Sequence, residues 1–304
     1  MPRRPPPDAR SSSSSRPARD DDPPSRSLAV ELVPARIDDA LGRRHGFVVA
    51  PATTVRRLID GEGDDLPGVV VDRYGPVVCV ELWAVDWPAR LEAFADRLLA
   101  EPGVTAVVAV LRTGAGTSEQ RVLRGTVPEA QVVVEAGCRY LVRVADERAV
   151  GSGIFVDQRE GRRLVRAASR GVAVVNLFAH AGAFGVAAAV GGAARVDHVD
   201  MAKKTAPWAA TNLALNGIDP RGHRFIVDDA LQVLAKLARR RGGYGVVVCD
   251  PPTQGVRKDG SRFVLRHSLA ELAEHGCAAL EDGGLLLLSC NDRDVPVAAV
   301  LAAA

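Results

Sequence analysis

The chain has 304 residues, almost half of them (47%) apolar, and its charges nearly cancel at a formal +2. That length is enough for one or two globular domains with a large core. The small net charge excludes a polybasic, histone-like protein but still allows a local basic face for phosphates. The five cysteines form no C-x-x-C pair, which argues against a zinc site or a disulfide framework. We therefore expect reduced thiols, no metal and a cytoplasmic protein.

Two segments need separate treatment before the folded part is considered. Residues 1–27 are rich in Pro, Ser, Arg and Asp and lack an apolar run, which predicts a disordered tail and not a secretory signal. The apolar run from Gly171 to Ala194 is long enough to span a membrane. However, Asn176, His180 and five glycines interrupt it, so we predict a strand, a turn and a buried helix, with no membrane partner.

Residues 28–145 have the pattern of a mixed α+β domain. Leu91, Phe94 and Leu98 recur at helical spacing and predict an amphipathic helix over 88–100. Short apolar runs predict the strands of this domain, which are Gly68–Val71, Val77–Trp83, Ala106–Leu111, Val132–Glu135 and Tyr140–Val144.

Residues 146–304 alternate between strand and helix patterns, and the strands are almost wholly apolar. The fold class expected is α/β, a Rossmann-like, mostly parallel sheet with helices on both faces, which binds ligands at the carboxyl ends of its strands. The expected strands are Val172–Leu177, Arg195–Val199, Arg224–Val227, Gly245–Cys249 and Gly284–Ser289. The expected helices are Arg159–Ser169, Ala183–Val190, Ala202–Asn216, Ala230–Arg240 and His267–Leu280. The last ten residues predict the start of one more helix, and we expect the last strands of such a sheet to be missing.

Three motifs at predicted strand ends suggest a bound nucleoside. Gly182, in the turn after the first strand, would let the backbone approach a ligand near a helix N-terminus, and the absence of a G-x-G-x-x-G pattern argues against NAD or FAD. Asp200 ends the next strand and could accept both ribose hydroxyls or cap a helix. Asp229 follows the third strand, where it could accept from an adenine amino group or serve as an N-cap.

Two further motifs point to a planar base. In Asp250-Pro251-Pro252 the prolines fix a rigid turn directly after a core strand, and such an edge can grip the polar edge of a base. Cys290 closes the next strand and should lie beside Asp250, where a thiolate could attack a pyrimidine ring. A buried, unreactive cysteine is the alternative.

Together these motifs resemble the class I S-adenosylmethionine-dependent methyltransferases of 23S ribosomal RNA, nearest to the cytosine-5 branch and next to the 7-methylguanine branch. The segments Arg57 to Tyr74 and Gly153 to Arg159 add to the resemblance, which runs from about Thr53 to Asn291.

The resemblance implies a role for each motif. Residues 28–145 would face the RNA and 146–304 would bind S-adenosyl-L-methionine. Cys290 would be the nucleophile, and Asp250 would hold the target base. Arg159, Pro251 and Pro252 would contact the substrate. The implied cofactor residues are Gln158, Asn176, Phe178, Gly182, Asp200, Met201, Asp229 and Asp250.

Departures from the family pattern leave alternatives open. His180-Ala181-Gly182 replaces the frequent Tyr-Thr-Gly, and Asn291 stands where a serine usually follows the cysteine. In the 7-methylguanine branch an Asn replaces Cys290, and Asp-Pro-Pro-Thr is common there as it is here. Cytosine C5 is therefore the expected target and guanine N7 the alternative. A non-catalytic RNA-binding relic and a methyltransferase for a small molecule or protein are the other hypotheses.

Overall fold

The computed structural model describes residues 33–45, 53–83, 91–114, 117–144, 151–240, 243–292 and 294–303. The predicted tail, 1–27, lies outside these ranges, as do 88–90 of the predicted helix. None of the helices within them is both long and apolar enough to cross a bilayer.

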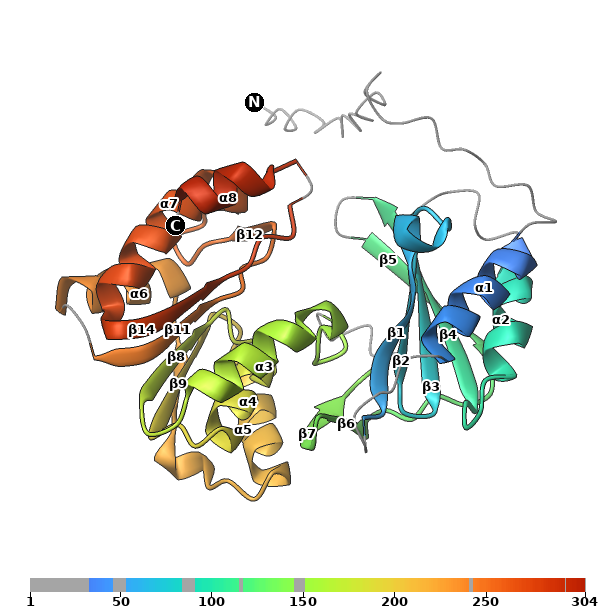
Figure 1. The fold of residues 1–304 in the computed structure, drawn as a ribbon, viewed down its shortest axis with the longest axis horizontal. Helices are drawn as coiled ribbons and strands as arrows, with labels where there is room; N and C mark the ends of the chain where they lie inside the picture. Colours follow the sequence, from blue (N-terminus) through green and yellow to red (C-terminus); the bar gives the residue numbers. More distant parts are fainter. Residues whose placement is uncertain are drawn as a thin grey trace, which may run out of the picture.

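The N-terminal part is built around a five-stranded sheet. Its order is β1-β2-β3-β4-β5, and all neighbours are antiparallel except the parallel pair β3 and β4. Two helices pack on one face of this sheet over a core of aliphatic side chains and Phe94 (Figure 1). The elements are α1 (Val33–His45), β1 (Val55–Asp60), η2 (Gly61–Asp64), β2 (Val69–Tyr74), β3 (Val77–Leu82), α2 (Leu91–Leu99), β4 (Ala106–Gly114) and β5 (Thr117–Arg124).

A hairpin joins this sheet to the rest of the molecule. It consists of β6 (Gln131–Glu135) and β7 (Cys138–Val142). Tyr140 of the hairpin is buried in one cluster with Val108 of the N-terminal sheet and with Val186 and Leu213 from two C-terminal helices. The apolar core is therefore continuous across residue 145, the expected domain boundary.

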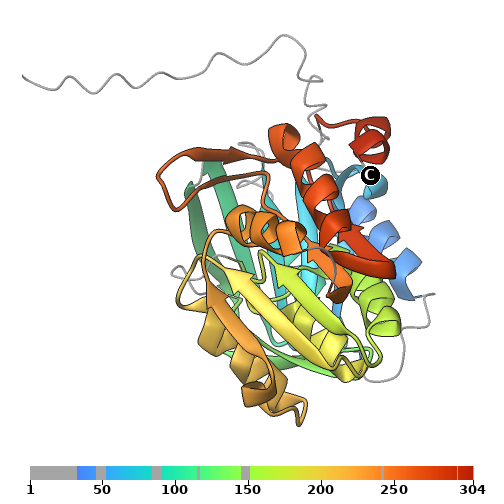
Figure 2. The same ribbon diagram turned by 90° about the vertical axis from the view of Figure 1, so that its left-hand side faces the viewer.

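The C-terminal part has five parallel strands in the order β10-β9-β8-β11-β14. In Figure 2 this part stands in front, with its strands side by side. Helices α3 and α4 pack on one face and α6 and α7 on the other. The elements are η4 (Val156–Gln158), α3 (Arg159–Ala168), β8 (Ala173–Leu177), α4 (Ala183–Val190), β9 (Arg195–Asp200), α5 (Thr205–Leu215), η5 (Pro220–Gly222), β10 (Arg224–Val227), α6 (Ala230–Arg240), β11 (Tyr244–Cys249), β12 (Gln254–Val256), β13 (Arg262–Val264), α7 (Leu265–Ala279), β14 (Leu280–Leu288) and α8 (Val297–Ala303).

The predicted α/β fold is confirmed, and most predicted elements begin and end within three residues of the observed ones. Four parts of the fold were not predicted from the sequence: α1, β1, β5 and the short β12–β13 hairpin. The two missed strands of the N-terminal sheet lie at its edges and read VRRLID and TSEQRVLR. Edge strands tolerate charged side chains, so neither strand carries the apolar run on which the prediction relied.

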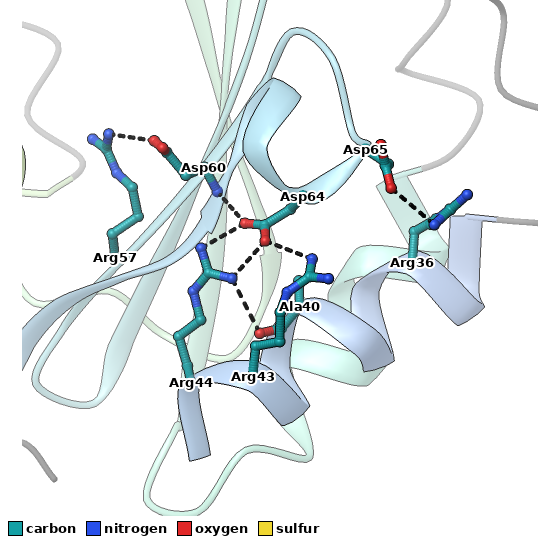
Figure 3. A network of polar contacts seen from close by, with 8 residues as sticks. All are labelled: Arg36, Ala40, Arg43, Arg44, Arg57, Asp60, Asp64 and Asp65. Carbon is teal, nitrogen blue, oxygen red and sulfur yellow. Dashed lines mark hydrogen bonds and ion pairs between the residues drawn. The ribbon is translucent and has the colours of Figure 1, made fainter. Parts of the chain in front are cut away.

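Asp64 fastens α1 to the turn after β1 (Figure 3). Its side chain is only 2% exposed and accepts hydrogen bonds from Arg43 (2.7 Å) and from Arg44 (2.5 and 2.6 Å). It also accepts one from the backbone N–H of Asp60 (2.7 Å). This part of the Arg57–Tyr74 resemblance segment therefore has a structural role.

We predict that Asp64→Asn lowers the free energy of unfolding by about 1–3 kcal/mol, because an amide cannot accept from all of these donors. Asp65→Asn is the matched control, since Asp65 pairs with Arg36 at 2.9 Å on the surface and should matter by less than about 0.5 kcal/mol. Urea unfolding measures both, and equal effects would contradict this account.

The stability difference between wild type and Asp64→Asn should depend on pH. Burial raises the pKa of Asp64, but the hydrogen bonds from Arg44, Asp60 and Arg43 outweigh it, and the pKa lies below the ordinary 3.8. The stabilisation is therefore complete above about pH 3.8 and is lost as the pH falls further. The stability difference between wild type and Asp64→Asn should shrink in that range; a constant difference would count against the ion pairs.

Candidate functional site

A pocket of about 660 Å³ lies at the carboxyl ends of the parallel strands, within the size range of small-molecule sites. The chain leaves β8 toward β9 and β10 on one side, and β11 and β14 lie on the other. The crevice at such a switch point is where open α/β sheets bind ligands. The predicted site residues that line it are Gln158, Phe178, Asp200, Met201, Asp229, Asp250, Pro251 and Pro252.

The loop after β8 is strained and is held by Asp200. Phe178 (φ 54°) and His180 (φ 47°) both have left-handed backbone, which is unfavourable for side chains of that size and tends to occur at functional sites. The Asp200 carboxylate accepts hydrogen bonds from the N–H of His180 and of Ala202, each at 2.8 Å. The carboxylate is thus oriented at the pocket wall by the backbone of two loops.

Gly182 ends this loop and Asn176 lies in β8 before it, and neither is among the pocket-lining residues. A Cβ on Gly182 would come within 2.7 Å of the Cβ of Ala209 on α5, so this glycine permits helix packing as well as its left-handed backbone (φ 80°). Asn176 is 1% exposed and pairs in register with His198 on β9. Among the described residues, neither the Asn176 amide nitrogen nor the His198 ring has a hydrogen-bond partner. Burial lowers the pKa of His198 from 6.5 to about 3, so the ring is neutral.

Asp229 closes the pocket on the α6 side. One carboxylate oxygen accepts from the N–H of Leu231 at 2.9 Å, which caps α6, and the other accepts from Arg257 at 3.0 Å. Arg257 belongs to the β12–β13 connection, and Phe263 of β13 packs on Phe178 with ring centroids 5.8 Å apart. The capping alternative is therefore confirmed, and a contact of Asp229 with adenine stays a prediction.

Asp250 lies at the end of β11, on the other side of the pocket from Asp229, among further polar groups. One of its oxygens accepts from the Gln158 amide at 3.1 Å and from the Ser289 hydroxyl. Burial raises the pKa of Asp250 above the ordinary 3.8, the neighbouring Asp157 raises it further, and the Ser289 hydrogen bond opposes both. With one oxygen so engaged, the other can face a ligand.

Cys290 and Arg159 do not line the pocket in the described part of the chain. Cys290 is half-buried against the apolar cluster under α6 and α7, while its neighbours turn the other way: Ser289 bonds to Asp250 and Asn291 lines the pocket. Arg159 donates to the carbonyl of Val55 at 2.6 Å. It therefore ties α3 to the N-terminal sheet.

Several lining residues were not singled out from the sequence. They include Arg112 from the N-terminal sheet, Lys204 and Trp208, for which the sequence offered no signal. Phe155 and His180 line the pocket too, and both lie in segments that carry the family resemblance. No group of three potential metal ligands occurs among the residues that the structure describes.

Comparison with known proteins gives concordant results. The model of the S-adenosylmethionine-dependent methyltransferase family matches residues 57–303. A "Ribosomal RNA large subunit methyltransferase" of Deinococcus radiodurans is 32% identical over 84% of this chain and 65% of its own length. A "Ribosomal RNA large subunit methyltransferase K/L" of Methylococcus capsulatus is 34% identical over 78% of this chain and 34% of its own length. The chain thus spans less than two thirds of each of these relatives.

A solved structure supports the same fold. The crystal structure of SMU.776 complexed with SAH superposes with a TM-score of 0.80 and is 27% identical. The match covers 91% of this chain and 72% of the other. A methyltransferase from Agrobacterium tumefaciens, 24% identical, shares the fold over 80% of this chain and 76% of its own, with a TM-score of 0.61.

Two glycine variants test what holds the loop after β8. Gly182 (φ 80°) and Gly171 (φ 76°) have nearly the same backbone, but nothing lies within 4 Å of a Cβ on Gly171. Gly171→Ala should cost about 1–2 kcal/mol of unfolding free energy from left-handed strain alone. Gly182→Ala should cost about 1–3 kcal/mol more, because it also meets Ala209. Equal losses in urea unfolding would remove the packing role of Gly182.

Proposed function

This chain belongs to the S-adenosylmethionine-dependent methyltransferase family, and from that premise we propose that it methylates a base of large-subunit ribosomal RNA. The observation that carries the proposal is the pocket itself. It joins acceptors suited to a nucleoside, at Asp200 and Asp229, to the rigid Asp250-Pro251-Pro252 edge in one continuous space. An RNA substrate and five free thiols fit a reaction in the cytoplasm.

The residues present are suited to S-adenosyl-L-methionine. Asp200 offers carboxylate oxygens for the ribose hydroxyls, and Phe178 with Phe263 offers an apolar surface for the adenine. Gln158 and the backbone of the loop after β8 would hold the methionine end. When bound, the cofactor supplies an electrophilic methyl group on a sulfonium. Within the pocket, the protein's part is to hold the acceptor atom in line with that methyl.

A ribosomal RNA substrate is supported by the printed names of the relatives and by the composition of the pocket. Arg112 from the N-terminal sheet lines the pocket, and it lies over the ring of Trp83 at 5.9 Å and pairs with Glu81 at 2.9 Å. The cleft between the two parts thus carries an arginine that can contact a phosphate. A pocket that bound only a small molecule would not require an arginine from the N-terminal sheet.

For the target base, the position of Cys290 favours guanine N7. The N7 lone pair can attack the methyl carbon directly while the sulfur–carbon bond breaks, so neither a nucleophile nor proton removal by the protein is needed. Two neighbouring carboxyl groups, Asp250 and Asp157, also suit the adjacent N–H donors of guanine. The second candidate is cytosine C5 with Cys290 as nucleophile, and the adjacency of Cys290 to Ser289, which contacts Asp250, favours it.

Two aspartate variants should each impair a different step, one the binding of the cofactor and the other the transfer of the methyl group. Asp200→Asn should weaken binding of S-adenosylhomocysteine by about 1.5–3 kcal/mol, because a charge-assisted acceptor is lost. Asp250→Asn should leave that affinity within about tenfold but abolish transfer of labelled methyl to ribosomal RNA. Calorimetry and a filter assay measure the two effects. Normal cofactor binding by Asp200→Asn, or normal transfer by Asp250→Asn, would refute the corresponding role.

Cys290→Ala separates the two bases. If guanine N7 is methylated, the variant should keep its rate within about tenfold, and RNA carrying 5-fluorocytosine should form no covalent adduct. Cys277→Ala serves as control, because Cys277 is an exposed thiol outside the pocket lining. Loss of essentially all activity together with a trapped adduct through Cys290 would instead establish cytosine C5 and covalent catalysis.

A further inference from the structure

Three aromatic rings form one side of the pocket. Phe155 and His180 have ring centroids 5.5 Å apart, and His180 and Trp208 5.4 Å apart. All three line the pocket, and we call them the aromatic wall. The cofactor contacts described above involve the backbone of His180 but none of these three rings.

The wall is held in place by its surroundings. A Cβ on Gly153 would approach the Trp208 ring to 2.5 Å, and one on Gly151 would approach the Phe155 ring to 3.2 Å. Trp208 donates its indole N–H to the carbonyl of Leu141 on β7 at 2.9 Å. The glycines of the Gly151-Ser-Gly153 segment therefore make room for rings that stand ready for a ligand.

The wall is accessible and has positive charge beside it. Phe155 is 47% exposed, so a ligand can reach its ring from solvent. The Arg143 guanidinium lies over the Trp208 ring at 5.7 Å, and Lys204 lines the same pocket. Flat rings interleaved with cations are the combination that binds single-stranded nucleic acid, by stacking on bases and contacting phosphates.

The pocket has a second aromatic group at its other end. Phe178 and Phe263 belong to the cluster under α6 and α7, beside Asp229. The aromatic wall instead lies by α5 and the β6–β7 hairpin, on the side of the N-terminal sheet. The end with Phe178 and Phe263 is thus available to the cofactor's adenine, and the aromatic wall is available to a different ring.

We propose that the aromatic wall is a stacking site for an unpaired RNA base that flanks the methylated nucleotide. This inference rests on the proposed function, since it requires an RNA substrate. Stacking is tolerant of sequence, so the wall would hold the strand open beside the target and would not select a particular base.

The test compares two probes that differ only in their bases. Binding of fluorescent single-stranded oligoadenylate is measured against an abasic ribose-phosphate chain of the same length, for wild type, Phe155→Leu and Phe155→Tyr. Phe155→Leu should bind oligoadenylate about tenfold more weakly and the abasic chain unchanged, while Phe155→Tyr restores binding. Leu164→Ala, at a 49% exposed position on α3, should behave as wild type.

Affinity for S-adenosylhomocysteine is measured on the same proteins and should stay within about twofold, which also shows that they are folded. If wild type binds both probes equally, or if Phe155→Leu loses the cofactor product and not oligoadenylate, the stacking site is wrong. Those results would leave the proposed function standing when wild type still methylates ribosomal RNA. Absence of transfer to ribosomal RNA would instead overturn the proposed function.

Discussion

The hydrogen bond from the His180 N–H to the Asp200 carboxylate organises the pocket, because it joins the loops after two neighbouring parallel strands. A second bond, from the N–H of Ala202, fixes the same carboxylate within its own loop. Left-handed backbone at Phe178 and His180 costs about 1–3 kcal/mol per residue, and charge-assisted hydrogen bonds of about 1.5–3 kcal/mol offset that cost. The result is a loop whose alternate side chains serve opposite ends of the pocket. Phe178 turns to Phe263 and His180 to Trp208.

The N-terminal sheet also contributes to the site, most of which lies at the ends of the parallel strands. The β6–β7 hairpin shares one apolar cluster with both, and Trp208 is positioned by a carbonyl of β7. Arg159 ties the first helix of the C-terminal part to β1, and Arg112 reaches the pocket from β4. Under the proposed function, these contacts would hold the N-terminal sheet, as the side that faces the RNA, next to the cofactor end.

The parallel sheet could be predicted from its apolar strands. The position of Asp200, Asp229 and Asp250 at the pocket could be predicted as well, because each follows the end of a predicted strand. Side-chain direction could not be predicted in the same way. Cys290 directly follows Ser289, yet it packs against the core while Ser289 reaches Asp250. The aromatic wall was missed because its rings come from three separate segments and meet only through tertiary packing.

If the molecule methylates a base of large-subunit ribosomal RNA as proposed, that base must depend on the chain in living cells. Nucleoside mass spectrometry can compare ribosomal RNA from cells lacking the chain with RNA from cells in which it is restored. We expect one methylated base of the large subunit, 7-methylguanine, to disappear with the chain and to return with it. An unchanged set of methylated bases in the two RNAs would contradict the proposed function.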